Sequence, residues 1–170
     1  MISVVRGALT DQSVDVIVNA ANTRMRGGGG IDGRIHQLAG PKMLDELRRI
    51  APRGAEVAEP FVTAGYELPH RHVIHIAGPI WRGTGDEPGL LESTYGNAYL
   101  KAVELGVPSI GFCSISTGAF GFPLALGAEI ALRTVVALAE DHPLDVVFAM
   151  FGAEEYEAFS RQLIVESKNS

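Results

Sequence analysis

Short apolar runs alternate with longer amphipathic stretches along this chain of 170 residues. The short runs are rich in β-branched residues and end at glycine, proline or polar turn residues, which is typical of β-strands. This pattern predicts six strands: Ile2–Arg6, Val14–Asn19, Pro60–Leu68, His72–Ala77, Val107–Cys113 and Asp145–Met150.

Between the strands, apolar residues recur at intervals of three and four, the period of an amphipathic helix. The clearest helix runs from Leu90 to Leu105 and is ended by Gly106. Further helices are expected over Gly33–Ala39, from Pro41 to Ile50, over Pro123–Ala139 and over Ala153–Ile164, with Val165–Ser170 expected to fray. Strands that alternate with helices indicate a single α/β domain over residues 1–170 with a mostly parallel sheet.

Composition narrows the classes of function without naming one. The chain is 46% hydrophobic and 20% charged, and its net charge of −6 argues against bulk nucleic-acid and membrane partners, which need basic patches. A nucleotide ligand stays open, because backbone amides hold phosphate without lysine. One cysteine and no signal-like leader predict a cytoplasmic protein without an internal disulfide.

Two loops rich in small residues are the candidates for chemistry. The first contains four consecutive glycines, Gly27–Gly30, between a strand and a helix, and the second runs over Ser114–Phe122 in the same context. Both would lie at the carboxyl ends of strands, where ligands bind in α/β sheets. One such loop is most simply a turn, but two placed alike predict a clamp that holds a diphosphate through main-chain N–H groups.

Other chemistries fit these loops poorly. The spacing Gly28-x-Gly30-x-x-Gly33 matches the dinucleotide-binding fingerprint, but Asn19–Arg26 separate it from the strand, so a NAD-dependent dehydrogenase is a weak alternative. Cys113 has Ala119, not arginine, six residues later, which argues against a cysteine phosphatase. His72 and His75 would point to opposite faces of a strand. No metal and no cofactor are therefore predicted.

The two loops carry a family resemblance. Asn19-Ala-Ala-Asn22, the glycine run and Ile31-Asp32-Gly33 with Ile35-His36 resemble the first macrodomain signature, and Ile115-Ser116-Thr117-Gly118 with Phe120-Gly121-Phe122-Pro123 resembles the second. The spacing from Asn22 to Asp32 to His36 is similar to that of the MacroD-type subgroup. The resemblance implies a three-layer α/β/α fold around a mixed six-stranded sheet. It also implies an enzyme that hydrolyses O-acetyl-ADP-ribose or ADP-ribosyl-glutamate and ADP-ribosyl-aspartate, with mono-ADP-ribosylated proteins as partners.

The resemblance also assigns roles to residues. Asn22, Asp32 and His36 would be catalytic: Asp32 would orient or polarise the attacking water, Asn22 would contact the distal ribose, and His36 would orient Asp32 or the ribose. Phe120 would lie near the distal ribose, and Phe151 would stack on adenine or pack in the core. The full set expected to bind the ligand is Ala8, Leu9, Asn19, Gly28, Gly29, Gly30, Ile31, Ser116, Thr117, Gly118, Ala119, Phe120, Gly121 and Phe151.

Asp32 is the most informative of these residues. It could simply cap the helix that follows, since Asp is a good N-cap. A carboxylate beside a diphosphate would repel it, so the position favours a role at a sugar hydroxyl or a water. A carboxylate of ordinary pKa, about 4, is a weak base at neutral pH. We therefore expect Asp32 to share the work with a substrate phosphate oxygen and with positioning of the water.

The chain departs from the family near its start. Members usually carry Gly-Asp-Ile-Thr, whose aspartate accepts a hydrogen bond from the adenine amino group, whereas the run here is Gly7-Ala8-Leu9-Thr10. Loss of a bond to a charged acceptor costs about 1.5–3 kcal/mol, or roughly tenfold to a hundredfold in affinity. We therefore expect weakened adenine selectivity, unless Asp11 replaces the acceptor. A module that reads ADP-ribose without cleaving it is the alternative to the hydrolase.

Overall fold

The computed structural model describes residues 1–169 and contains one six-stranded sheet. The strand order is β1 (Ile2–Arg6), β6 (Asp145–Met150), β5 (Ser109–Phe112), β2 (Val16–Ala21), β4 (His72–Ala77) and β3 (Phe61–Ala64). Neighbouring strands are parallel except for the antiparallel pair β3 and β4. The sheet is therefore mixed and mostly parallel, as the sequence predicts.

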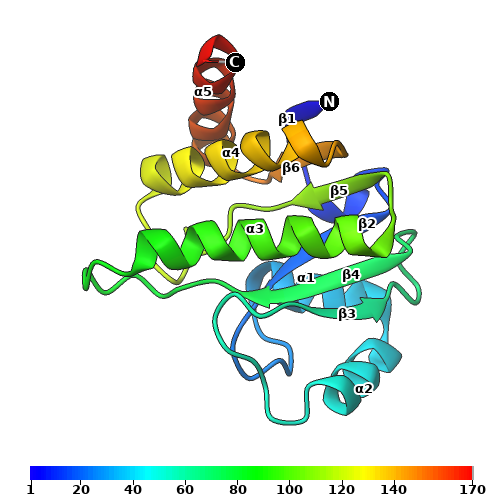
Figure 1. The fold of residues 1–170 in the computed structure, drawn as a ribbon. Helices are drawn as coiled ribbons and strands as arrows, with labels where there is room; N and C mark the ends of the chain where they lie inside the picture. Colours follow the sequence, from blue (N-terminus) through cyan, green and yellow to red (C-terminus); the bar gives the residue numbers. More distant parts are fainter. Residues whose placement is uncertain (170) are drawn as a thin grey trace.

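Helices cover both faces of this sheet (Figure 1). On one face lie α1 (Gly30–Ala39) and α2 (Pro41–Ile50), and on the other lie α3 (Glu87–Leu105), α4 (Leu124–Asp141) and α5 (Ala153–Asn169). This is the three-layer α/β/α arrangement that was expected. Among residues 1–169, no helix is long and apolar enough to cross a membrane.

The alternation of side chains along β2 decides what lies under each helical layer. Val16 and Val18 pack in the large apolar cluster beneath α3 and α4, whereas Ile17 belongs to the smaller cluster that contains Ile35 of α1. Asn19 has the same parity as Ile17 and therefore lies on the α1 face, fully buried. A polar residue in that position requires buried hydrogen-bond partners.

Element boundaries differ from the expectations at several places. The second strand covers residues 16–21 instead of 14–19, and α1 begins at Gly30, three residues before the expected start. The expectation that residues 165–169 fray is wrong: α5 continues to Asn169, and the side chains of Gln162 and Glu166 are bonded across one turn. Ser170 lies outside the described residues. A short 3-10 helix, Leu9–Asp11, follows β1.

Candidate active site

A cavity of about 350 Å³ lies over the carboxyl end of β2, between the first loop (residues 22–29) and the second loop (residues 114–122). Because β5 and β4 flank β2 in the sheet, the loops that follow these three strands meet there. Expected site residues that line the cavity are Asn22, Gly28, Gly29, Gly30, Ile31, Asp32, Ser116, Gly118, Ala119 and Phe120. Ala20, Ala21, Gly78, Ser114 and Ile115 line it as well. Ser114 and Ile115 belong to the predicted second loop, whereas Ala20, Ala21 and Gly78 were not predicted.

The first loop is held by its own polar side chains. Asn22 accepts a bond from the Arg24 N–H through Oδ1, and its Nδ2 donates to the Gly27 carbonyl over 3.2 Å. The Arg26 guanidinium donates to the Met25 carbonyl and to Ala51 and Pro52 at the end of α2. Arg26 therefore anchors the loop to α2, while Arg24 is exposed.

Two glycines permit the close approach of the first loop and α1. A Cβ on Gly33 would lie 2.5 Å from the carbonyl oxygen of Gly28, a separation that no side chain tolerates. A Cβ on Gly28 would lie 3.2 Å from Asn22 Nδ2 and 3.3 Å from Asp32 Oδ2. The absence of a side chain at Gly28 thus brings the polar ends of Asn22 and Asp32 to the same place in the cavity wall.

Main-chain donors face the cavity at the start of α1. Its N-cap residue, Gly29, provides no side-chain cap, so the N–H groups of Gly30, Ile31 and Asp32 have no acceptor within the helix. On the opposite wall, Gly121 N–H bonds to the Gly118 carbonyl over 3.0 Å and closes the turn of the second loop. Such uncapped helix starts bind anions. The geometry fits the predicted diphosphate clamp.

The second loop passes directly over the end of β4. A side chain on Gly78 would collide with Ser116 and Ile115, so only glycine fits there. Ser116 has a positive φ of 68°, an uncommon conformation for a residue with a side chain. Its buried hydroxyl has no hydrogen-bond partner within residues 1–169. Ser116 lines the cavity, while its hydroxyl is buried from solvent.

Asp32 is a buried carboxylate, with 4% of the residue exposed. Because α1 begins at Gly30, Asp32 lies inside the first turn and makes no N-cap bond. Its Oδ1 accepts a 2.7 Å hydrogen bond from Asn19 Nδ2 and lies 3.4 Å from His36 Nε2. Burial raises the pKa of Asp32 above its ordinary value, and the Asn19 bond and the His36 charge offset this only in part. The carboxylate is a stronger base than the sequence suggested.

Asn19 and His36 lie behind Asp32, outside the set that lines the cavity. The predicted facing of Asp32 and His36, one helical turn apart, is confirmed by the 3.4 Å separation. Sequence reasoning missed two further buried residues in this cluster, His75 and Thr63, because His75 was weighed only as a metal ligand. The available signal in the sequence was a histidine within an apolar strand; that it shares a face with Asn19 of the neighbouring strand is seen only in the structure.

The expected adenine end lies at the adjacent strands β1 and β6. Gly7 N–H bonds to the Met150 carbonyl over 2.9 Å, so Ala8 and Phe151 both follow neighbouring strand ends. Phe151 is 85% exposed and so is not a core residue, whereas the Leu9 side chain is buried in the α1-side cluster. Asp11, the alternative acceptor, is exposed.

Two expected residues have local structural contacts in the second loop. Thr117 shares a hydrogen bond between its hydroxyl and that of Ser114, and its methyl group faces Gly127 of α4. Gly121 has a φ of 74° and closes the turn. Both residues shape the loop from behind the cavity wall.

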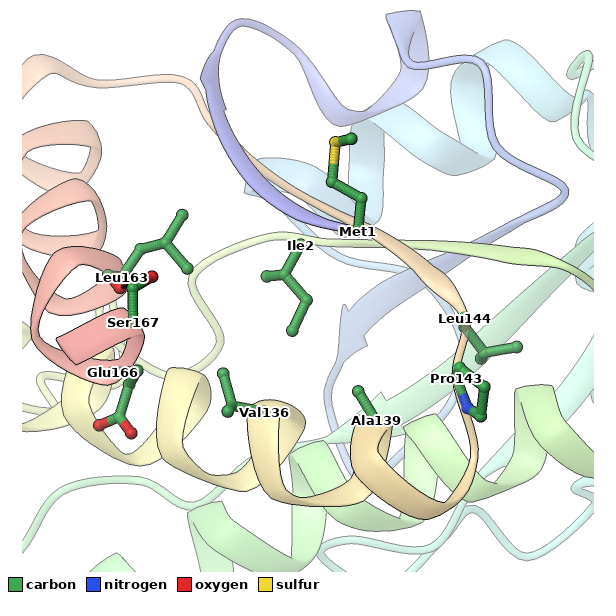
Figure 2. Close-up of a pocket in the computed structure, with 9 residues that line it drawn as sticks. All are labelled: Met1, Ile2, Val136, Ala139, Pro143, Leu144, Leu163, Glu166 and Ser167. Carbon is green, nitrogen blue, oxygen red and sulfur yellow. Dashed lines mark hydrogen bonds between the residues drawn. The ribbon is translucent and has the colours of Figure 1, made fainter. Parts of the chain in front are cut away.

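Another hollow, of about 340 Å³, lies at the amino end of β1 (Figure 2). It is formed by Met1 and Ile2, by Val136 of α4, and by Leu163 of α5 among others. The lining is mostly apolar, and parallel strands start there instead of ending. This hollow lacks the converging loops and main-chain donors of the cavity over β2.

Known proteins identify the family of this fold. Residues 18–131 match the family model of the Macro domain, a segment that includes both loops of the cavity. The chain belongs to the Macro domain family. It is 41% identical over 167 residues to a protein of Escherichia fergusonii named O-acetyl-ADP-ribose deacetylase, covering 95% of this chain and 94% of that protein.

Solved structures are similar over the same length. A macrodomain of Oceanobacillus iheyensis with ADP superposes with a TM-score of 0.92 at 36% identity, covering 98% of this chain and 92% of that one. A Trypanosoma brucei macrodomain in complex with ADP-ribose gives a TM-score of 0.87 at 41% identity, covering 94% of this chain and 68% of that one.

Proposed function

We propose that this macrodomain binds ADP-ribose and hydrolyses esters formed on it, either O-acetyl-ADP-ribose or ADP-ribose linked to glutamate and aspartate side chains. The observation that carries the proposal is the buried Asp32 carboxylate. It faces the same cavity as the uncapped start of α1 and lies beside the amide of Asn22. A site that only held a diphosphate would gain nothing from a negative charge beside it.

Each group has a role in this proposal. The first-turn N–H groups of α1 and the second loop hold the diphosphate. Asn22 contacts the distal ribose, whose hydroxyl carries the ester. Asp32 holds the attacking water and accepts its proton as the ester carbonyl is attacked, and that proton passes to the ribose oxygen as its bond to the acyl carbon breaks. His36 steadies the carboxylate. The raised pKa of Asp32 brings it closer to the working pH of a base.

The ester end of the substrate has room beside the cavity. A second hollow of about 430 Å³ shares Asn22, Gly78 and Phe120 with the first and extends toward Arg82. Ile80, at 45% exposure, is an apolar contact on its rim. We propose that an acyl group or the side chain of a mono-ADP-ribosylated protein occupies this hollow.

A reader module that binds ADP-ribose without turnover is the second candidate. It would need the two loops but not Asp32, so the buried carboxylate favours the hydrolase. A dehydrogenase is poorer, since residues 22–29 separate the end of β2 from α1 whereas dinucleotide-binding glycines follow the strand directly.

The test combines turnover and binding. Wild-type protein is incubated with O-acetyl-ADP-ribose and with a glutamate-ADP-ribosylated protein, and ADP-ribose affinity is measured by calorimetry. We expect Asp32→Ala to lower kcat by about a hundredfold or more, while ADP-ribose affinity changes by less than about threefold. Full turnover by Asp32→Ala would remove the assigned mechanism, and tight binding with no turnover by the wild type would make the protein a reader.

A further inference from the structure

A chain of buried hydrogen bonds runs beneath the cavity from β3 to α1. Thr63 Oγ1 lies 2.9 Å from His75 Nε2, and His75 Nδ1 lies 3.1 Å from Asn19 Nδ2. The same Asn19 nitrogen donates to Asp32 Oδ1 over 2.7 Å. Thr63, His75 and Asn19 are at most 1% exposed, so water does not share these bonds. Four secondary-structure elements are thus linked to one carboxylate.

The hydrogen atoms of this chain can be placed by elimination. An amide nitrogen only donates, so His75 Nδ1 must accept from Asn19, and the imidazole proton is on Nε2. That Nε2–H then donates to Thr63 Oγ1, whose own hydrogen goes to the Ala64 carbonyl over 3.0 Å. Each hydrogen bond therefore has a defined donor and acceptor. Of the two hydrogens on Asn19 Nδ2, one is donated to His75 Nδ1 and the other to Asp32 Oδ1.

Burial keeps His75 neutral and the Asn19 amide in one orientation. Burial, together with the nearby charge of His36, lowers the pKa of His75 to about 3, so the ring stays neutral near physiological pH. Asn19 Oδ1 has no hydrogen-bond partner within residues 1–169, so the two Nδ2 contacts alone orient the amide. A buried amide that leaves its oxygen unpaired is stabilised only if both nitrogen bonds are made.

We propose that Thr63 and His75 are positioning residues of the hydrolase, which act through Asn19 to hold Oδ1 of Asp32 so that Oδ2 faces the cavity beside Asn22. This inference rests on the proposed function. It adds that the lone pair of His75 Nδ1, kept toward Asn19 by the Nε2–H bond to Thr63, holds the Asn19 amide nitrogen within reach of Asp32.

Removal of the Thr63 hydroxyl should propagate along this chain. The His75 Nε2–H would be left without an acceptor, and the ring would lose the contact that holds it against Asn19. His75 Nδ1 would then fix the Asn19 amide less firmly, and the Asn19 bond to Asp32 would weaken. Because the Asn19 bond holds the pKa of Asp32 down, its loss raises that pKa further. The titratable side chain that lies against Asp32 is His36 of α1, whose ring centroid is 5.8 Å from that of His75 of β4. The Arg26 guanidinium of the first loop is bonded at the end of α2.

Thr63→Val tests this with little change of volume, and Thr63→Ser restores the hydroxyl. Thr94→Val is the matched control, because Thr94 is equally buried on α3, across the sheet, and its hydroxyl donates only to the Leu90 carbonyl of its own helix. With O-acetyl-ADP-ribose, we expect Thr63→Val to lower kcat by about tenfold or more with KM changed less than about threefold. The acid limb of its kcat profile should move to higher pH. Thr63→Ser and Thr94→Val should keep both kcat and the acid limb.

A wild-type kcat in Thr63→Val, or a loss that Thr94→Val shares, overturns the proposal. A second readout does not require turnover: carboxyl ¹³C NMR follows the Asp32 titration, and imidazole ¹⁵N shifts report the His75 tautomer. If the wild type hydrolyses no ester, the proposed function fails by itself. The positioning role is then supported if Thr63→Val raises the Asp32 titration midpoint and overturned if that midpoint is unchanged, while the wild-type ¹⁵N shifts should show the His75 proton on Nε2.

Discussion

Gly28 shows at the scale of one residue how the site depends on a missing side chain. Its backbone is outside the left-handed region, so alanine is tolerated conformationally and its effect is purely steric. The added methyl group would press on Asn22 Nδ2 at 3.2 Å and on Asp32 Oδ2 at 3.3 Å. We expect Gly28→Ala to lower kcat on O-acetyl-ADP-ribose by about tenfold or more, because displacement of a catalytic group is costly.

Gly89→Ala is the control for this substitution. Gly89 is exposed on α3, and a Cβ there meets no atom within 4 Å. Its turnover should match the wild type, with slightly higher thermal stability from better helix propensity. Equal activity of Gly28→Ala and Gly89→Ala would show that the spacing of Asn22 and Asp32 tolerates a methyl group.

Substitution of Ala8 tests the adenine end of the site, because a carboxylate there should strengthen ADP-ribose binding. It follows β1 beside the end of β6, next to the exposed Phe151, so a carboxylate there would face a ligand that stacks on that ring. We expect Ala8→Asp to tighten ADP-ribose binding by roughly tenfold or more, since a bond to a charged acceptor contributes about 1.5–3 kcal/mol. Calorimetry with ADP-ribose and its inosine analogue measures both affinity and base selectivity.

Asn is the matched control at this position. Ala8→Asn adds similar volume without the charge, and its gain should be smaller. If neither variant binds ADP-ribose more tightly than the wild type, adenine is held elsewhere, and the assignments of Ala8 and Phe151 both fail.

At the scale of elements, sequence patterns located all six strands and five helices, because the strands are short apolar runs rich in β-branched residues and the helices carry a three-to-four-residue apolar period. The start of α1 was the informative miss. Glycine has low helix propensity, so the pattern placed the start at residue 33, yet Gly30 enters with a φ of 58° and the helix begins there. This shift puts Asp32 in the first turn. The interpretation of Asp32 as a helix cap is therefore wrong: its carboxylate accepts a hydrogen bond from Asn19 and none from the helix N-terminus.

The first loop is held to α2 by one arginine, and this permits a paired test. Arg26 donates to the carbonyls of Ala51 and Pro52, while Arg24 is exposed two residues earlier. We expect Arg26→Gln to weaken ADP-ribose binding about fivefold to tenfold, because the loop must then be ordered on binding. Arg24→Gln removes the same charge and should change affinity less than twofold. Equal losses in the two variants, reduced by salt, would instead indicate long-range attraction of the diphosphate.

At the scale of the whole molecule, the sheet order determines which predicted residues meet. The loops after β2 and β5 could be paired from sequence because both follow buried strands, and they do face one cavity. The contacts of His75 and Thr63 could not, since they depend on β3 pairing antiparallel with β4 and on α1 lying over Asn19. Long-range pairing of this kind leaves no local period in the sequence.

Three buried groups give the molecule as a whole a pH-dependent stability. His75 has a native pKa of about 3 against 6.5 for an ordinary histidine, so between these values the unfolded chain binds the proton and the native state does not. Stability from this group is therefore complete above about pH 6.5 and falls as the pH is lowered, by about 1.4 kcal/mol per pH unit. Urea unfolding of wild type and His75→Gln at intervals between pH 7 and 5 should show a steeper decline for the wild type. Parallel curves would mean that His75 is protonated in the native state or exchanges with water.

Glu87 adds a second decline at lower pH, which separates the two groups. Burial of its carboxylate opposes ionisation, but N–H groups of Arg82, Thr84 and Gly85 bond to it and lower its pKa to about 2. Its contribution is complete above about pH 4.5 and is lost as the pH falls through 2. Glu87→Gln should therefore follow the wild type between pH 7 and 5 and diverge only below.

Asp32 acts in the opposite sense, because its raised pKa makes the native state lose stability as the carboxyl ionises with rising pH. Asp32→Asn should then be more stable than the wild type at pH 7 and equal to it in acid, a pattern expected where a charge is kept buried for catalysis.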